Sequence, residues 1–299
     1  MINHAVEVNR LTKSFDNITA VQDVSFKLES NKIYGFLGRN GAGKTTIMQM
    51  LTSQSFATSG DVKIFGEDPY ENYDVLRQIC FIKESQKYPD SFRIKDVLKV
   101  SQEIFPNWDE EYALKLIEDF QLPLNRTMKK LSRGMLSAAG IVVGLASRAQ
   151  LTIFDEPYLG LDAVARGLFY DLLIEDYAMH PRTIILSTHL IDEVSKLLEH
   201  IILIDKGRLL LNEDADALRG RAYTVVGSTS SVQSFITGKE VIHLEPFVSM
   251  LSATIMGALK SEERSLAAEM GLEVSPVSLQ QLIVHMTKSN LDERVGNGR

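Results

Sequence analysis

Short, almost entirely apolar runs recur along the first two thirds of the chain. They occupy residues 33–37, 151–154, 183–187 and 201–204. Parallel β-strands that are buried on both faces have this pattern, because neither face needs polar side chains. Residues 6–8 and 21–28 also have a strand-like pattern, with apolar and polar side chains alternating at 6–8. The pattern therefore predicts an α/β protein built around a buried parallel sheet.

A helical pattern interrupts these strands between about residues 91 and 148. Apolar side chains recur there at helical spacing. One expected face consists of Ile94, Val97, Leu98, Ile104 and Phe105, and a second consists of Trp108, Tyr112, Leu116 and Phe120. Pro106 and Pro123 punctuate this region. We therefore expect a helical insert within the α/β core.

The pattern changes again after Gly220, where the chain becomes rich in serine. The expected elements are a strand at 223–226, a helix near 232, strands at 240–244 and 253–256, a helix at 261–270, a strand at 272–274 and a helix at 279–286. The order β-α-β-β-α-β predicts a small ferredoxin-like α+β domain. We place this accessory domain at residues 222–299, after a first domain at 1–221, and expect a frayed tail at 295–299.

Composition narrows the class of protein. Hydrophobic residues make up 44% of the 299 residues and charged residues 24%, which argues against a largely disordered chain. The 32 basic and 39 acidic residues give a net charge of −7, so we expect no nucleic-acid partner. Cys80 is the only cysteine, which excludes an intramolecular disulfide and fits a reducing cytoplasm.

The sequence also predicts no membrane-spanning segment. A spanning helix needs about 20 predominantly apolar residues, and residues 134–147 form the longest weakly polar stretch without charge. The first ten residues lack the apolar region of a signal peptide. Any action at a membrane is therefore expected to require a partner protein.

Residues 38–45 read Gly-Arg-Asn-Gly-Ala-Gly-Lys-Thr and fit the pattern G-x-x-x-x-G-K-[ST]. Glycines let a backbone wrap a phosphate chain at the positive end of the following helix. Lys44 can then reach the β- and γ-phosphates, and the Thr45 hydroxyl can bind Mg²⁺. The alternative is a flexible turn, but the predicted strand before the loop and helix after it favour a phosphate site.

Two adjacent carboxylates follow the predicted strand at 151–154. Asp155 is expected to hold Mg²⁺ through its water shell, and Glu156 to orient or deprotonate the attacking water. A strand that ends in Asp-Glu is by itself more often a solvated strand end. Downstream of a phosphate loop, the pair predicts nucleotide hydrolysis.

A third motif just upstream, Leu-Ser-Arg-Gly-Met at residues 131–135, completes a resemblance to the ATP-binding cassette (ABC) ATPases. The resemblance covers residues 7 to about 221. It implies a P-loop NTPase core with an antiparallel β-subdomain and a helical insert. It also implies that Ser132 and Gly134 close over the γ-phosphate bound by the opposite subunit. Arg133 and Met135 depart from the usual Leu-Ser-Gly-Gly-Gln, and Arg133 either adds charge near the phosphates or points into solvent.

The same resemblance implies further roles. Asp162 matches an aspartate that lies across the dimer interface, and His189 matches the switch histidine that contacts the γ-phosphate. Phe15 takes the place of the aromatic residue that stacks on adenine, unless it is an ordinary core residue. The implied catalytic residues are Lys44, Glu156 and His189. The loop residues expected to bind ATP are Gly38, Arg39, Asn40, Gly41, Ala42, Gly43, Lys44, Thr45 and Thr46.

One position matches the family poorly. Glu84 stands where the family usually has the glutamine of its Q-loop, and Gln86 lies two residues further on. A carboxylate at this place can contact Mg²⁺ or the attacking water, so Glu84 is a third candidate metal contact beside Thr45 and Asp155. Which of Glu84 and Gln86 serves as the Q-loop residue stays open at this point.

The resemblance implies an ATP-hydrolysing subunit of a bacterial ABC transporter, similar to those of antibiotic and acetoin exporters. The expected partners are a second copy, bound head to tail, and a polytopic membrane permease that contacts the helical insert and the loop at residues 84–90. The protein would then lie at the cytoplasmic face of the cell membrane. A heterodimer with another cassette, a non-transport ABC ATPase and a weakly hydrolysing regulatory cassette are the alternatives.

Overall fold

The computed structural model describes residues 4–84 and 86–296, with side chains up to residue 287. The chain forms two compact units. One comprises Met1–His189 and Leu197–Asn212, and the other Leu190–Lys196 and Glu213–Arg299. The second unit thus begins before residue 222 and includes a short segment from the middle of the first. Within the described residues, no helix is both long enough and apolar enough to cross a bilayer.

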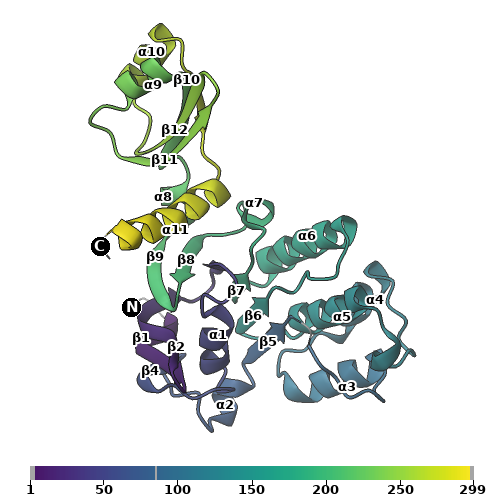
Figure 1. The fold of residues 1–299 in the computed structure, drawn as a ribbon. Coiled ribbons are helices and arrows are strands. Elements are labelled where there is room, and N and C mark those ends of the chain that lie inside the picture. The colour runs from purple at the N-terminus through teal and green to yellow at the C-terminus, as the bar shows by residue number, and fades with distance from the viewer. Residues whose placement is uncertain (1–3, 85, 297–299) are drawn as a thin grey trace. The chain divides into compact units, whose positions relative to one another are not determined.

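A six-stranded sheet forms the centre of the first unit, with strand order β5-β6-β7-β3-β8-β9 (Figure 1). Its strands are β3 (Ile33–Leu37), β5 (Ile79–Lys83), β6 (Leu151–Asp155), β7 (Thr183–Ser187), β8 (His200–Asp205) and β9 (Arg208–Asp214). The pairs from β5 to β8 are all parallel, and every residue of β3, β6 and β7 is buried. The predicted buried parallel sheet is therefore confirmed.

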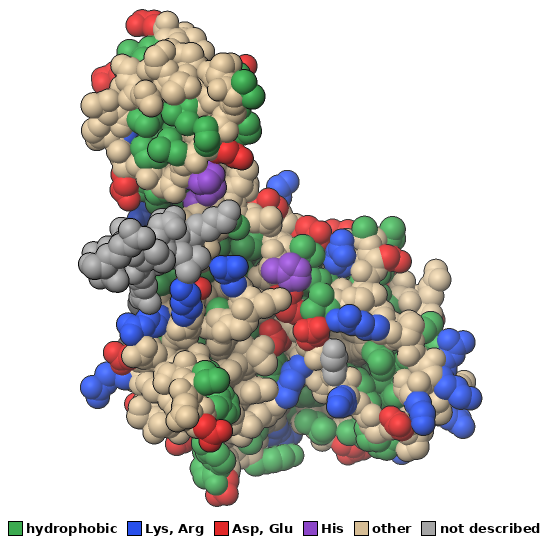
Figure 2. Space-filling view, in the orientation of Figure 1, with side chains coloured by type: hydrophobic (Ala, Val, Ile, Leu, Met, Phe, Trp, Pro, Cys, Tyr) green, Lys and Arg blue, Asp and Glu red, His purple; other side chains and the backbone are tan. Residues whose placement is uncertain are grey.

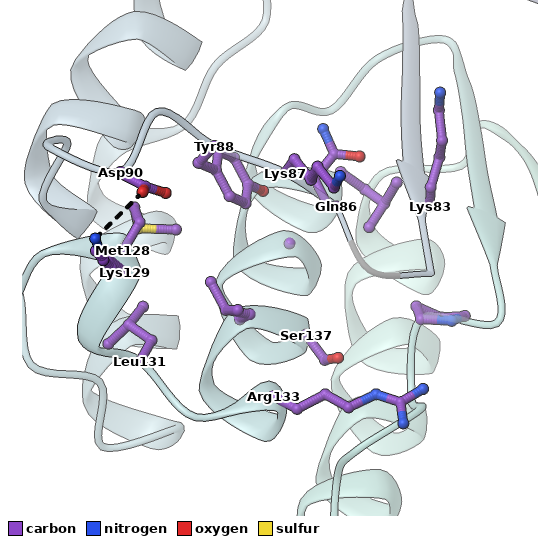
Figure 3. Close-up of a pocket in the computed structure, with 14 residues that line it drawn as sticks. Lys83, Gln86, Lys87, Tyr88, Asp90, Met128, Lys129, Leu131, Arg133 and Ser137 are labelled. Carbon is purple, nitrogen blue, oxygen red and sulfur yellow. Dashed lines mark ion pairs between the residues drawn. The ribbon is translucent and has the colours of Figure 1, made fainter.

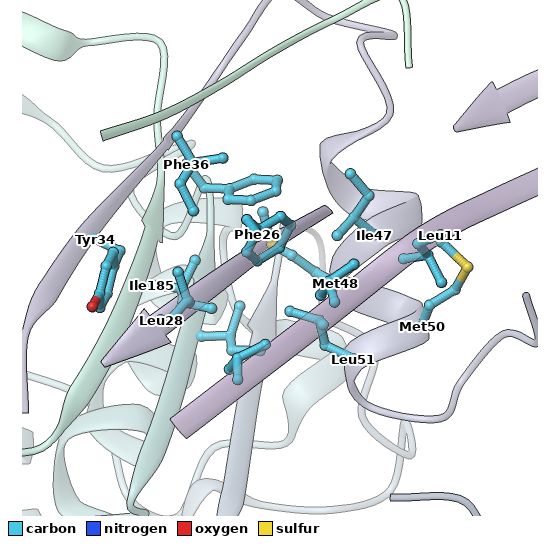
Figure 4. Packing of buried hydrophobic residues seen from close by; sticks show 14 of the residues in the cluster. Leu11, Phe26, Leu28, Tyr34, Phe36, Ile47, Met48, Met50, Leu51 and Ile185 are labelled. Carbon is cyan, nitrogen blue, oxygen red and sulfur yellow. The ribbon is translucent and has the colours of Figure 1, made fainter. Parts of the chain in front are cut away.

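A second, antiparallel sheet lies in the same unit, with strand order β2-β1-β4. It consists of β1 (His4–Phe15), β2 (Ile18–Glu29) and β4 (Ser59–Ile64). Helix α1 (Lys44–Leu51) packs beside it, and their apolar side chains meet in one core (Figure 4). The rings of Phe26 and Phe36 lie 5.9 Å apart there, which joins the antiparallel sheet to β3. Burial of each such side chain stabilises the fold by about 1.5–3 kcal/mol.

The helical insert is confirmed, although each of the two predicted faces is wrong in part. The insert consists of α3 (Ile94–Ile104), α4 (Glu110–Asp119), the 3-10 helix η1 (Met128–Lys130) and α5 (Arg133–Ala146), and a short helix α2 (Tyr73–Leu76) precedes it. Ile104 is 47% exposed because α3 ends there, two residues before Pro106. Trp108 lies before α4, and its indole nitrogen donates a hydrogen bond to Glu110 at 2.7 Å.

The remaining helix of the first unit, α6 (Ala163–Met179), connects β6 to β7. Its 17 residues begin at a cap, since the Asp162 side chain accepts a hydrogen bond from the Ala165 amide at 2.8 Å.

On the face drawn in Figure 2, Lys and Arg side chains are interspersed with Asp and Glu side chains rather than gathered into one stripe.

The second unit has the predicted ferredoxin-like order. It contains β10 (Ala222–Ser228), α9 (Thr229–Phe235), β11 (Val241–Phe247), β12 (Met250–Met256), α10 (Ser261–Glu269) and β13 (Glu273–Pro276). These strands form an antiparallel sheet of order β11-β12-β10-β13. The unit also contains α7 (Ile191–Val194), α8 (Ala215–Leu218) and α11 (Leu279–Gly296). Helix α11 continues through residues 295–296 of the expected tail, and residues 297–299 lie outside the described part of the chain.

Candidate functional site

The loop between β3 and α1 has the conformation that a phosphate site needs. Gly43 has a φ of 104°, and a Cβ there would lie 2.6 Å from the Ala20 carbonyl oxygen, so a larger residue does not fit. Lys44 begins α1, and its ammonium group donates a hydrogen bond to the Gly38 carbonyl at 2.7 Å. The loop thus places amide groups and a lysine at the N-terminus of α1, which is suited to bind an anion.

Lys44 is buried, and acidic groups lie beside it. Only 7% of the residue is exposed, and desolvation lowers the pKa of its ammonium group, although the charges of Glu156 and Asp155 act in the opposite direction. The nearby carboxylates therefore favour the charged form, and a bound phosphate chain would stabilise it further.

Thr45 and Asp155 are brought together from positions 110 residues apart. Asp155 ends β6 and is 4% exposed, and its Oδ2 atom accepts a hydrogen bond from the Thr45 hydroxyl at 2.6 Å. A hydroxyl and a carboxylate are hard oxygen donors of the kind that Mg²⁺ prefers. The donor set of these two residues therefore fits this ion.

Glu156 lies beside them in an unusual backbone conformation. Its φ is 51°, a value that non-glycine residues seldom adopt and that is often found at functional sites. The Oε2 atom lies 2.8 Å from Nδ1 of His189, which follows β7. The Oε1 atom is buried and has no hydrogen-bond partner among the described residues. The structure thus brings two of the three predicted catalytic side chains, Glu156 and His189, into contact.

Tyr158 is a member of this cluster that sequence reasoning missed. Its hydroxyl group contacts Oε2 of Glu156, lies 2.7 Å from the Thr188 hydroxyl and accepts a hydrogen bond from the His189 amide at 3.2 Å. Burial and the adjacent Glu156 raise the pKa of Tyr158. Its position two residues after Glu156 was the one available signal, but the sequence does not tell in which direction the ring points.

These groups surround a cavity of about 480 Å³. Its lining includes Asn40, Gly41, Ala42, Gly43, Lys44, Thr45, Thr46, Glu84, Asp155, Glu156 and His189. Glu84 lines this cavity, whereas Gln86 lines a different pocket, between the loop that follows β5 and α5. Geometry therefore favours Glu84 over Gln86 at the Q-loop position.

The start of α5 contains the motif at residues 131–135. The Ser132 side chain caps this helix by accepting a hydrogen bond from the Met135 amide at 3.2 Å. A Cβ on Gly134 would lie 2.6 Å from the Gly160 carbonyl oxygen, so this close approach requires glycine. Arg133 forms an ion pair with Glu84 at 2.8 Å, and its side chain remains 61% exposed.

Other candidates lie outside the lining of the cavity. Phe15 is 48% exposed with the Lys13 ammonium group 4.8 Å from its ring centre, so it is not an ordinary core residue. Asp162 caps α6, as described above. The Gly38 carbonyl accepts the hydrogen bond from Lys44. Arg39 lines an adjacent pocket together with Asp205 and Lys206.

Comparisons with known proteins agree with this geometry. The sequence pattern of the ABC transporter family matches residues 21–159. An uncharacterized ABC transporter ATP-binding protein, YcbN of Bacillus subtilis, is 32% identical over 227 residues, which cover 74% of this chain and 73% of YcbN. The chain belongs to the ABC transporter ATP-binding proteins. Its enzymatic class is that of an ABC ATPase.

Further relatives of this ABC ATPase have names that refer to transport. The bacitracin transport ATP-binding protein BcrA of Bacillus licheniformis is 31% identical, and the match covers 72% of each chain. The lantibiotic transport ATP-binding protein SrtF of Streptococcus pyogenes is 31% identical over 71% of this chain and 91% of its own.

Solved structures share the fold. An ATP-binding subunit of an ABC transporter superposes with a TM-score of 0.65 at 23% identity, over 72% of this chain and 91% of its own. A dimeric ATP-binding cassette bound to ADP and Pi superposes with a TM-score of 0.62 at 20% identity, over 70% of this chain and 98% of its own. The P-loop NTPase core expected from the sequence is thereby confirmed.

Proposed function

We propose that this ABC ATPase binds ATP in the cavity beside α1 and hydrolyses it to power a separate membrane permease, as the ATPase subunit of a bacterial exporter. The convergence of Lys44, Thr45, Asp155, Glu156 and His189 on one cavity carries the proposal. The names of the relatives BcrA and SrtF, which refer to the transport of bacitracin and of a lantibiotic, support the assignment to a transporter.

In this proposal each side chain has a distinct task. Lys44 and the loop amides bind the β- and γ-phosphates and orient the nucleotide. The Thr45 hydroxyl and the Asp155 carboxylate would hold Mg²⁺, which neutralises phosphate charge when bound, and Glu84 is a further candidate for a contact to that ion. Glu156 orients the attacking water and accepts its proton, and His189 holds the carboxylate of Glu156 and reaches towards the γ-phosphate.

We further propose that two copies close head to tail over two ATP molecules. The N-terminus of α5 supports this arrangement, because Ser132 and Gly134 there present a helix end that can bind the γ-phosphate held by the other copy. Asp162 would lie at the same interface, and the exposed ring of Phe15 is available to stack on adenine. Closing and reopening of this dimer would drive the permease.

The contact with the permease is proposed on the helical insert. An apolar groove of about 330 Å³ lies between α3 and the loop that follows β5, lined in part by Tyr88, Pro89 and Phe92. Val100 and Ile104 of α3 line it as well, although they are 43% and 47% exposed. A neighbouring pocket, shown in Figure 3, contains Gln86 and Lys87 of the same loop together with Arg133 and Ser137 of α5. A helix of the permease is the expected occupant of the groove.

Co-purification from native cells tests this proposal. The tagged protein is expected to recover a stoichiometric polytopic membrane protein from gently solubilised membranes. The variant Val100→Asp/Ile104→Asp changes two exposed residues of the groove and is expected to lose that partner. Ile174→Asp on α6, where Ile174 is 44% exposed, is the matched control and should retain it. Recovery of a soluble homodimer alone, of ribosomes or of DNA-repair factors would contradict the transporter function.

A further inference from the structure

Tyr158 makes polar contacts with both members of the proposed catalytic pair, Glu156 and His189. Its hydroxyl group contacts the Glu156 carboxylate and the backbone amide of His189, and it lies 3.3 Å from Nδ1 of the same histidine. We propose that Tyr158 is a positioning residue for ATP hydrolysis, which holds Glu156 and His189 in the arrangement that activates water. This inference rests on the proposed function, because it assigns a task within the same site.

Proton positions in this cluster follow from what each group can donate. An ionised carboxylate only accepts hydrogen bonds, so both contacts to Oε2 of Glu156 must come from donors. The Tyr158 hydroxyl supplies one proton and Nδ1–H of His189 supplies the other, the latter at 2.8 Å. Oε2 is then fully engaged, and the lone pairs of the unpartnered Oε1 remain for a water molecule.

The hydroxyl oxygen of Tyr158 is itself held in place. It accepts a hydrogen bond from the His189 amide at 3.2 Å. Because its own proton goes to Glu156, the Thr188 hydroxyl, 2.7 Å away, can only donate to it. Both lone pairs of the oxygen are then used. The network therefore holds the hydroxyl group in place beside Glu156.

The ring of Tyr158 is fixed by burial. The residue is 1% exposed, and its ring lies 5.8 Å from that of His189 and 6.5 Å from that of Tyr170 on α6. The Glu156 amide in turn donates to the Ser187 carbonyl at the end of β7, at 3.2 Å. Tyr158 thus ties the loop after β6 to the loop after β7, at the point where the two proposed catalytic side chains meet.

The contact with Tyr158 also helps to hold the backbone of Glu156 in an unfavourable conformation. Glu156 has a φ of 51°, and such a conformation persists only where the surroundings impose it. Without the Tyr158 hydroxyl, the hydrogen bond with His189, whose side chain is half exposed, is the one that the carboxylate keeps among the described residues. We therefore expect the carboxylate of Glu156 to lose its fixed orientation when the hydroxyl is removed.

The test is Tyr158→Phe, which removes the hydroxyl and keeps the buried ring. We expect kcat for ATP hydrolysis to fall about ten- to a hundred-fold, the loss typical of a catalytic group that is displaced by about 1 Å. The KM for ATP should stay within about two-fold of the wild-type value, because Tyr158 does not line the nucleotide cavity.

Tyr34→Phe is the matched control. It also removes a buried tyrosine hydroxyl from the first unit, one that donates to the Glu29 carbonyl at 3.1 Å. We expect a similar change in unfolding temperature for both variants and a loss of kcat for Tyr158→Phe alone. A purely structural role would instead raise KM or lower the unfolding temperature of Tyr158→Phe well beyond that of Tyr34→Phe, and would overturn the inference.

The inference and the function on which it rests fail in different ways. If the wild-type protein hydrolyses ATP and Tyr158→Phe has the same kcat, Tyr158 has no positioning role and the proposed function stands. If the wild-type protein does not hydrolyse ATP, the proposed function is wrong and the inference falls with it.

Discussion

The Arg133 guanidinium group donates a hydrogen bond to the Glu84 carboxylate, with 2.8 Å between Nη2 and Oε1. These residues occupy two positions where the sequence departs from the pattern of its family. Glu84 also lines the nucleotide cavity, so the pair places a compensating positive charge next to an acidic group that would otherwise repel ATP. The two unusual residues therefore compensate each other's charge.

A double-mutant cycle tests this complementarity. Arg133→Ala leaves the Glu84 charge unpaired and is expected to raise the KM for ATP about three- to ten-fold, whereas Arg133→Ala/Glu84→Gln should return it close to the wild-type value. The effect on stability should be small, at most about 1 kcal/mol, because both side chains are partly exposed. Equal KM values for the single and the double variant would show that the two residues do not act together.

A pair of glycine substitutions tests the close approach at the start of α5. Gly134→Ala would place a Cβ 2.6 Å from the Gly160 carbonyl oxygen, and we expect it to lower the free energy of unfolding by about 1–3 kcal/mol. Gly167→Ala on α6 is the control, because no atom lies within 4 Å of its added Cβ apart from the adjoining residues and the backbone of its own helix. Alanine there should stabilise the helix by about 0.5–1 kcal/mol. Urea denaturation measures the change in the free energy of unfolding for both variants. Equal changes would contradict this account of Gly134.

Asp176 is expected to be essential for stability. This 5% exposed carboxylate on α6 forms an ion pair with Arg182 at 2.6 Å and lies 3.5 Å from Arg148. Asp176→Asn leaves these guanidinium groups without a buried counter-charge and should cost about 3–5 kcal/mol. The exposed Asp171 on the same helix provides the control, Asp171→Asn, which should have little effect on the denaturation midpoint. A similarly small effect of Asp176→Asn would exclude the proposed stabilisation.

The parts of the fold with strong local patterns were predictable. The strand at Ile33–Leu37, the glycine loop and the helix after it follow from a run of apolar residues and a motif with defined chemistry. The ferredoxin-like order also followed from alternating strand and helix patterns. The strand at Ser59–Ile64 was missed, because five of its six residues are exposed or only partly buried and its pattern is weak.

The contacts within the site were less predictable than its members. The sequence identified Glu156 and His189 but neither the direction of the Tyr158 ring nor the pairing of Arg133 with Glu84 across 49 positions. Such contacts depend on how the helical insert and the loops after β5, β6 and β7 fold against one another. No periodic pattern encodes that arrangement.

The most direct test of the central claim is the steady-state rate of ATP hydrolysis of the wild-type protein and of Glu156→Gln. The substitution keeps the size of the side chain and removes the carboxylate that we propose accepts the proton of water. We expect the wild-type protein to hydrolyse ATP and the variant to lose this activity at least a hundred-fold, while it still binds ATP. A variant that hydrolyses ATP at the wild-type rate would contradict the account and favour a regulatory cassette that does not use Glu156 in catalysis.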